Sequence, residues 1–485
     1  MIFLGIDAGT QGVRATASDE NGILIASAHR QYEHFNLASE QMLTLGHKEQ
    51  SPDEWWSALR EVLIVIRSGI MQSADATTAS ATSASATSAS GAAPGTASVS
   101  PASGATSGTT QTPVAAVCID GTSGTIVPLD EDNKPLGNAI MYNDVRGNGG
   151  KALPKIKWCK ENGCGPDHKI PSRYVHHADY IVGKLTGEYG ITDWSNALKS
   201  GYDVRKEEWT DDAKETFGEG ISKVVACGSV IGEINIDDNE LAYLNGAKLV
   251  AGASDGYMSA IATCAVNPGE WASIIGTTLI LKGVTKNYID DPNGCVYCHK
   301  HPQGYWMPGG ASNVGGRCLN EWFGEESFAA LNKIAAETTP TGILEYPLMV
   351  EGERFPFLDA KYPGFGDHKD FTAVIEGIAY VERLCFEKLM ELGCEVGDTI
   401  YSTGGACKSD VWLQIRADVL GRTIKVPEVT DAAIGGAMLA ASGVYYDNLS
   451  EAVSHMGRIA KIVTPQKSRY EEIYKKFKEK AESYL

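Results

Sequence analysis

The sequence lacks several features that would assign it to whole classes of protein. Its 485 residues contain 42 Lys and Arg against 61 Asp and Glu, a formal net charge of −19, so no basic excess favours nucleic acid or an anionic membrane. No apolar run approaches the roughly 18 residues of a membrane span. The opening residues MIFLGID also lack the basic and apolar regions of a signal peptide. We therefore predict a cytoplasmic protein with no nucleic-acid or membrane partner.

Two common nucleotide-binding signatures are missing as well. No GxGxxG follows the first predicted strand and no GxxxxGK[ST] occurs, which disfavours Rossmann and Walker sites. The 11 cysteines are an odd number without the spacing of a disulfide scaffold, which favours free thiols in a reducing compartment. The stretch CVYCH at 295–299 matches a haem-attachment pattern, or a metal site if His301 joins it. Because no second pair stands at zinc-site spacing, we favour buried thiols on a strand.

What the sequence does contain is an alternation of strand and helix patterns, over a chain too long for one core. We predict strands at 2–7, 12–18, 23–32, 114–120, 248–253, 271–276, 278–284 and 399–403, and helices at 53–70, 176–186, 256–265, 317–323, 371–393, 409–420, 431–442 and 467–483. The alternation indicates an α/β chain with mostly parallel sheets, each opening with an antiparallel meander. A domain boundary is predicted near residue 246, between domains at 1–246 and 247–485.

One segment departs from this pattern. Residues 73–113 are almost wholly Ala, Ser, Thr, Gly and Pro, with no aromatic and no basic side chain. Such a composition buries too little apolar surface to offset the entropy of ordering. We predict a disordered insertion between the helix before it and the strand after it.

The first candidate for chemistry is the hairpin sequence GIDAGTQGVRAT. Gly9 allows a tight turn and close approach of a ligand, and the Thr10 hydroxyl with nearby N–H groups can hold phosphate oxygens. Asp7 stands where a bound cation would lie, since Mg²⁺ takes one or two carboxylates plus phosphates. Arg14 could reach a phosphate from the outgoing strand. Taken alone, this pattern equally describes an ordinary turn.

A second carboxylate follows a later strand, in GASDGYMSAI. Asp255 stands between this buried strand and an apolar-spaced helix, where it could accept the proton of a substrate hydroxyl during phosphoryl transfer. The structural alternative is a helix N-cap, for which Asp is also favoured. The two roles are compatible.

Small residues recur at other strand ends. ASIIGTTLILKG echoes the first hairpin, although shared turn residues alone could produce this echo. In STGGACKSD, Gly404 and Gly405 would let a flat base or ribose lie against the backbone, or would simply form a turn into a helix. GGASNVGG at 309–316 supplies a further place where a ligand could approach the backbone.

The order of these motifs resembles that of the FGGY carbohydrate kinases: a DxGT hairpin, then DGTSGT, YNDVR, GASDG, GTT, GGASN and TGGACKSD. The resemblance covers nearly the whole chain apart from residues 73–113. It implies two actin-like (ribonuclease H-like) domains flanking a catalytic cleft, with the sugar bound by the N-terminal domain and the nucleotide by the C-terminal one. It also implies ATP, Mg²⁺ and a small sugar as ligands, and it leaves a homodimer open.

The resemblance assigns roles to individual residues. Asp255 would be the catalytic base, Asp7 would lie at Mg²⁺ and the transferred phosphate, and Ser123 would help these two carboxylates hold the sugar. The residues assigned to ATP and its phosphates are Gly9, Thr10, Gln11, Arg14, Gly276, Thr277, Thr278, Gly310, Asn313, Gly404, Gly405 and Ser409. Gln11 and Ser409 depart from the family pattern, where Ser or Thr and Asn respectively are common.

The same resemblance suggests an acceptor. DGTSGT, WSNALKSGYDV and GERFPF are similar to the cyanobacterial and plant kinases that act on D-ribulose. We therefore expect phosphorylation of D-ribulose to D-ribulose 5-phosphate. D-xylulose, L-ribulose or a polyol are the alternatives within the enzyme class, because a few pocket contacts decide among them. An actin-like ATPase or sugar sensor without kinase turnover is the alternative outside it.

Overall fold

Two large sheets form the framework of the molecule. The computed structural model describes residues 1–39, 43–86, 114–148, 151–466 and 469–485. In spatial order, the first sheet contains β13 (Val230–Glu233), β14 (Lys248–Val250), β5 (Val114–Gly121), β1 (Ile2–Ala8), β2 (Gly12–Asp19) and β3 (Leu24–Gln31). The second contains β17 (Tyr297–Lys300), β18 (Trp306–Ser312), β16 (Leu279–Gly283), β15 (Trp271–Ile275), β19 (Thr399–Gly404), β20 (Thr423–Pro427) and β21 (Ile459–Val463).

The two sheets repeat one topology. In each, a hairpin of antiparallel strands, β1–β2 or β15–β16, is followed by a later strand that pairs in parallel beside the first, β5 or β19. This repetition gives the echo between the two hairpin sequences a structural basis. The predicted α/β class, with an antiparallel meander opening each sheet, is confirmed. The prediction of mostly parallel sheets is wrong: in the two large sheets the parallel pairings are β1–β5, β14–β5, β15–β19 and β19–β20, and the other pairings are antiparallel.

Smaller strands and the helices surround the sheets. A small four-stranded sheet contains β4 (Glu49–Gln50), β7 (Ala139–Ile140), β6 (Ile126–Leu129) and β8 (Arg173–His176), and short pairs join β9 (Ile191–Asp193) to β12 (Lys223–Val225) and β10 (Tyr202–Asp203) to β11 (Glu208–Trp209). The helices are α2 (Pro52–Ala86), α3 (Ala152–Asn162), α4 (His177–Thr186), α5 (Trp194–Ala197), α6 (Asp211–Phe217), α7 (Asp255–Ala262), α8 (Arg317–Phe323), α9 (Phe328–Thr338), α10 (Phe371–Glu391), α11 (Asp410–Leu420), α12 (Ala432–Val444), α13 (Leu449–Met456) and α14 (Glu471–Glu482). Within the described ranges, no helix combines the length and apolar character needed to cross a membrane.

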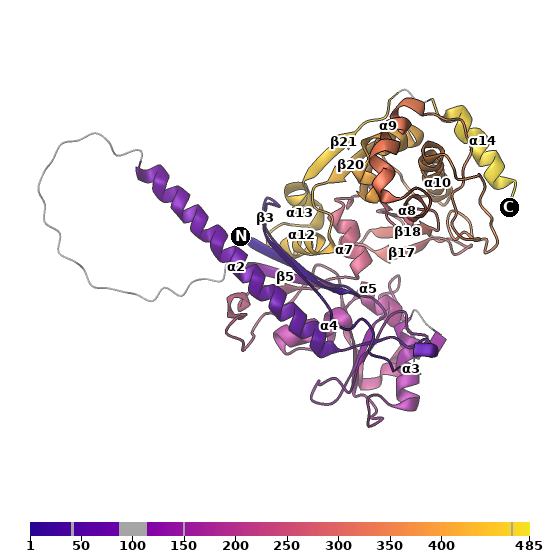
Figure 1. Cartoon of the computed structure of the whole chain (residues 1–485). Coiled ribbons are helices and arrows are strands. Elements are labelled where there is room, and N and C mark those ends of the chain that lie inside the picture. Colours follow the sequence, from indigo (N-terminus) through magenta and orange to yellow (C-terminus); the bar gives the residue numbers. More distant parts are fainter. Residues whose placement is uncertain (40–42, 87–113, 149–150, 467–468) are drawn as a thin grey trace, which may run out of the picture.

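Helix α12 joins the C-terminal half of the chain to the first sheet. It packs on β1 and β5 and against α7, as the central part of Figure 1 shows. A Cβ atom at Gly5 would lie 1.7 Å from the backbone oxygen of Ala433, so only glycine allows this helix to approach so closely. The contact brings Asp431, the N-cap of α12, near the end of β1.

The predicted boundary near residue 246 does not coincide with the change of sheet. Strand β14 follows that position, yet it pairs in parallel with β5 in the first sheet. The second sheet begins only at Trp271. The short apolar sequence LVAGA does not indicate which sheet the strand joins, because a buried parallel strand has the same apolar pattern in either sheet.

The tract at 73–113 also differs from its prediction. Helix α2 continues to Ala86 and projects away from the body in Figure 1, so residues 73–86 are helical rather than disordered. The buried segment from Trp55 to Ile70 forms the helix against β2 and β3, and the alanine-rich continuation can extend a helix that has already formed. Residues 87–113 lie outside the described part of the chain.

We expect the tract to be dispensable. Replacing residues 75–111 by a four-residue Gly-Ser linker should leave kcat within twofold and Tm within about 2 °C, because Ile70 is the last buried side chain among those that the structure describes in α2, up to Ser73. Coupled ADP-release assays and thermal unfolding would check this. A large loss of either quantity would show that the tract contributes to the folded body.

The cysteines are buried thiols. All eleven are free, and Cys407 alone is more than slightly exposed. Cys298 lies on β17, as expected for CVYCH, and Cys295 lies just before it. Among the described residues, no group of three or more His, Cys, Asp or Glu side chains could hold a metal ion.

Candidate active site

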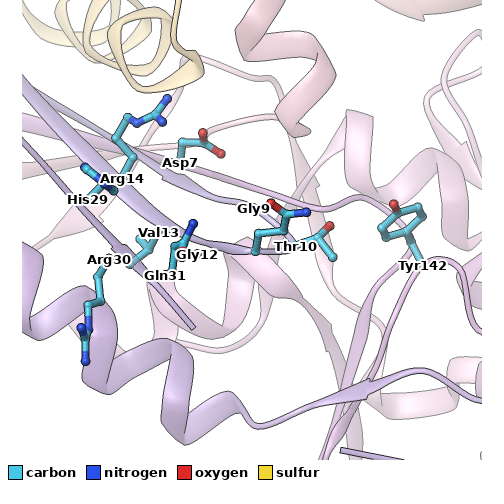
Figure 2. A pocket seen from close by; sticks show the side chains of 11 residues that line it. Asp7, Gly9, Thr10, Gly12, Val13, Arg14, His29, Arg30, Gln31 and Tyr142 are labelled. Carbon is cyan, nitrogen blue, oxygen red and sulfur yellow. The ribbon is translucent and has the colours of Figure 1, made fainter. Parts of the chain in front are cut away.

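The β1–β2 hairpin places Asp7 and Arg14 opposite each other. The two residues are paired in the antiparallel register, and the turn is closed by a 2.9 Å hydrogen bond from the Gly9 N–H to the Gly12 carbonyl. Figure 2 shows both side chains extending to one side of the hairpin, with Thr10 at its tip facing Tyr142. A cavity of about 520 Å³ opens here, lined by Asp7, Gly9, Thr10, Gln11, Gly12, Val13, Arg14, His29, Arg30, Gln31 and Tyr142.

A carboxyl that the sequence reasoning missed lies beside Asp7. Asp120 is fully buried near the end of β5, in register with Asp7 on the neighbouring strand. Burial, followed by the charges of Asp7 and Asp255, raises the pKa of Asp120 well above its usual value. Neither carboxyl oxygen of Asp120 has a hydrogen-bond partner within the described residues, and the pKa of Asp7 is itself raised, chiefly by burial.

Asp255 is the first residue of α7, and its carboxylate is not the helix cap. The N-cap is Ser254, which forms a parallel bridge with Gly121 at the end of β5. The only hydrogen bond to the Asp255 carboxylate among the described residues is 2.7 Å long and comes from the adjacent Gly256 N–H. Burial and the charge of Asp7 raise the pKa of Asp255, whereas Lys282 and Lys199 lower it. The carboxylate is thus left available to a ligand.

Asp7, Asp120 and Asp255 form one acidic site at adjacent strand ends. Each of the outer two carboxylates raises the pKa of Asp120, which lies on the strand between β1 and β14. Asp431, at the start of α12, adds a further negative charge that raises the pKa of Asp7. Ser123 lies in the turn after β5, and its hydroxyl makes no hydrogen bond within the described residues.

A second cavity of about 520 Å³ opens at the other hairpin. Gly276 and Thr277 of the β15–β16 turn line it, as do Gly405 and Ser409 after β19. Ser409 caps α11 by accepting from the Trp412 N–H at 3.2 Å, and it donates to the Asn332 side chain at 2.8 Å. The cavity is also lined by Ile275, Gly316, Arg317, Leu319, Asn320, Glu325, Phe328, Ala329, Asn332, Phe371, Ala406, Lys408 and Trp412.

Several predicted nucleotide contacts do not line this cavity. Gly404 has a φ of +94° and lies against the backbone of Ile275, so it serves as a turn residue. The carbonyl of Thr278 accepts a hydrogen bond from the Gly276 N–H and so closes the hairpin turn. Gly310 lies under the Phe355 ring, 2.8 Å from where a Cβ would be.

Asn313 likewise has a structural role here. Its N–H donates to Glu353 at 2.7 Å and its side chain donates to the Gly352 carbonyl at 3.0 Å. Gly310 and Asn313 therefore support the loop at 352–355, and their approach to the nucleotide stays a prediction. Arg317 and Asn332 also line the cavity, and no sequence motif pointed to them because both lie outside the glycine-rich motifs.

The fold and site define a class of protein: two α/β units of repeated topology, each with a glycine-containing hairpin at a cavity. Comparisons with known proteins agree. The model of the FGGY family of carbohydrate kinases matches residues 148–262 with its N-terminal domain and 271–444 with its C-terminal domain. The chain belongs to the FGGY family of carbohydrate kinases, and it is an ATP-dependent sugar kinase.

Individual relatives match over most of the chain. A xylulose kinase of Staphylococcus epidermidis is 26% identical over 533 aligned positions, covering 99% of this chain and 97% of the relative. A gluconokinase of Bacillus licheniformis is 28% identical, covering 65% of this chain and 71% of the relative. The crystal structure of a xylulose kinase from Rhodospirillum rubrum superposes with a TM-score of 0.77 at 22% identity, covering 100% and 99% of the two chains. The predicted two-domain actin-like fold is thereby confirmed.

Proposed function

We propose that this kinase transfers the γ-phosphoryl group of ATP to the primary hydroxyl of a ketopentose, with D-ribulose as the first candidate and D-ribulose 5-phosphate as the product. The motifs DGTSGT, WSNALKSGYDV and GERFPF support D-ribulose. The relatives named above are a xylulose kinase and a gluconokinase, so D-xylulose is the second candidate. A sugar sensor without turnover is not retained, since the chain belongs to a kinase family.

The observation that carries the proposal is the free carboxylate of Asp255. It lies at the start of α7 and, within the part of the chain that the structure describes, accepts a hydrogen bond only from the adjacent Gly256 N–H; the charge of Asp7 raises its pKa. A kinase needs a base there to receive the proton of the attacking hydroxyl.

The chemistry follows from this arrangement. The sugar hydroxyl gives its proton to the Asp255 carboxylate while its oxygen bonds to the γ-phosphorus. The bond from that phosphorus to the bridging oxygen of ADP breaks, and ADP leaves. The backbone N–H groups of Thr10 and Thr277, at the tips of the two hairpins, would hold phosphate oxygens in line, since the Gly9 and Gly276 N–H groups close the turns. Arg14 would add positive charge beside the transferred group.

The residues at the first hairpin fit a bound Mg²⁺. Among the described residues, no cluster of three or more ligating side chains exists, and Asp7 supplies a single half-buried carboxylate at the cavity. This set suits a cation that takes its other ligands from ATP phosphates and water. When bound, Mg²⁺ would neutralise charge on the phosphates, with Asp7 as its protein ligand and Asp120 buried beside it, in register on the neighbouring strand.

An acceptor panel tests the proposed function. We expect ADP release in the presence of ATP and Mg²⁺ to rise at least tenfold with D-ribulose over D-xylulose, L-ribulose, hexuloses and polyols, because misplaced hydroxyls leave polar groups in the pocket unpaired. A pyruvate kinase–lactate dehydrogenase coupled assay would measure this. Equal rates with every acceptor would contradict the choice of D-ribulose, and a preference for D-xylulose would replace it.

A further inference from the structure

Lys282 is a buried ammonium that has no carboxylate partner. It lies on β16 just beyond the second hairpin, and its side chain is 4% exposed. Its Nζ atom is 3.2 Å from Nδ1 of His299 and lies over the rings of Tyr257 and Tyr297 at 5.2 and 5.8 Å. Within the described residues, no Asp or Glu oxygen comes within the 4.0 Å of an ion pair. An ammonium carries three donors, so His299 leaves two of them for other partners.

The nearest opposing charge is that of Asp255. The two charges stabilise each other, which places them within electrostatic range although they form no ion pair. Tyr257 connects Asp255 with Lys282, because it follows Asp255 by two residues on α7 and its ring lies against Lys282. The Lys282 ammonium and the Asp255 carboxylate are too far apart for direct contact. A single hydroxyl placed between a carboxylate and an ammonium can form a hydrogen bond with each, and each bond is about 2.8 Å long.

A second lysine approaches the same carboxylate from the other half of the molecule. Lys199, in the short 3₁₀ turn Leu198–Ser200, is half-buried and also lowers the pKa of Asp255. It makes no ion pair and no hydrogen bond within the described residues. Hence lysines from two distant segments, Lys282 on β16 and Lys199 after α5, lie near the proposed base, and within the described residues neither lysine is in contact with an acid.

Burying an ammonium is costly unless it is paired and hydrogen-bonded. His299 compensates only in part, because burial lowers its pKa well below the usual value and it faces Lys282 as a neutral ring. Oxygen atoms of a bound ligand would supply the missing acceptors. Lys282 lies near the carboxylate that takes the proton of the sugar hydroxyl. The ligand expected at Lys282 is therefore the sugar rather than the adenine of ATP.

Resting on the proposed function, we propose that Lys282 binds the acceptor sugar, donating a hydrogen bond to a sugar oxygen next to the hydroxyl that Asp255 deprotonates. Its charge also keeps Asp255 ionised until the proton is transferred. The groups that face Lys282 are Asp255, Lys199, His299, Cys298 and Cys227. Of these, only Asp255 carries the negative charge that a base needs.

Steady-state kinetics of Lys282→Met and Lys282→Arg test the proposal. Met removes the donors and the charge at similar length, so kcat/KM for the sugar should fall about 10- to 100-fold, with the KM for ATP within threefold. Loss of the positive charge raises the pKa of Asp255, so the acidic limb of the kcat/KM profile should move to higher pH. Arg keeps the charge and should recover part of the loss.

Lys425→Met is the matched control. Lys425 also lies over a tyrosine ring, with its Nζ 5.6 Å from the centroid of Tyr401, but it is not among the groups that face Asp255. Its kinetics should equal those of the wild type. The proposal is overturned if Lys282→Met keeps its sugar kcat/KM within twofold, or loses sugar and ATP parameters equally together with Tm.

Sugar-induced thermal shifts separate this proposal from the kinase assignment. Each acceptor sugar, added without ATP, should raise the Tm of the wild type. The same sugar should leave the Tm of Lys282→Met unchanged. If D-ribulose stabilises only the wild type but no acceptor supports ADP release, Lys282 binds sugar and the proposed reaction fails. If no sugar stabilises the wild type, the binding proposal fails as well.

Discussion

Replacing Asp255 by Asn is expected to reduce kcat by about 10²- to 10⁴-fold, because an amide cannot accept the proton of the attacking hydroxyl. The effect should appear in kcat rather than in the KM for ATP, since the cavity at the second hairpin, where we propose that the nucleotide binds, is lined by residues of α8, α9 and the turn after β19, not by α7. Asn keeps the shape of Asp and the bond from the Gly256 N–H, so the start of α7 should be preserved. Coupled ADP release and ATP-induced thermal shifts would measure the two effects.

The control for this variant is Asp290→Asn, an exposed carboxylate outside both cavities. It removes the same charge and should leave kcat unchanged. Turnover by Asp255→Asn at the wild-type rate would rule out Asp255 as the base. The pH profile gives an independent check: activity requires ionised Asp255, whose pKa is raised by burial, so kcat/KM should fall as the pH drops through that raised value.

The sequence was sufficient for the parts of this site that lie within continuous motifs. Asp7, Gly9, Thr10 and Arg14 could be grouped because a hairpin brings neighbours in sequence together, and the register pairs Asp7 with Arg14 as the turn requires. Asp255 was identified because a strand, a carboxylate and a helix follow one another. In both cases local structure alone determines where the side chain lies.

Asp120 could not be assigned in the same way. The motif DGTSGT directed attention to Ser123, whereas the importance of Asp120 depends on the parallel pairing that sets it beside Asp7. Lys282 and Lys199 were missed for the same reason, since each meets Asp255 only after two distant segments have packed. Long-range pairing of this kind is not encoded in the periodicity of any single segment.

The glycine-rich stretch GGASNVGG illustrates a different limit. Its glycines suggested an approach for the nucleotide, and Gly316 does line the cavity at the second hairpin, whereas Gly309 and Gly310 lie within strand β18. They are needed there because the aromatic rings of Tyr297 and Phe355 lie on them. In the sequence, a glycine that makes room for protein side chains cannot be distinguished from one that makes room for a ligand.

Breaking the buried pair of Arg416 and Glu382 is expected to give the largest loss of stability. The guanidinium of Arg416, on α11, donates to both oxygens of Glu382, on α10, at 2.8 Å, and to the hydroxyl of Ser402 at 2.7 Å. Both charged side chains are 0% exposed. Arg416→Met leaves the Glu382 carboxylate buried without its partner, which should cost about 3–5 kcal/mol in the free energy of unfolding measured by urea titration.

The double variant Arg416→Met, Glu382→Leu removes both charges and should recover most of that loss, because apolar replacements of a buried pair are often neutral or stabilising. Arg458→Met serves as the surface control: its 2.8 Å pair with Glu428 joins side chains that are 50% and 53% exposed, and should contribute less than about 1 kcal/mol. Since neither Arg416 nor Glu382 lines a described cavity, the double variant should retain wild-type kcat. An Arg416→Met protein as stable as the control would show that the sheet and helices, rather than this pair, hold the second half together.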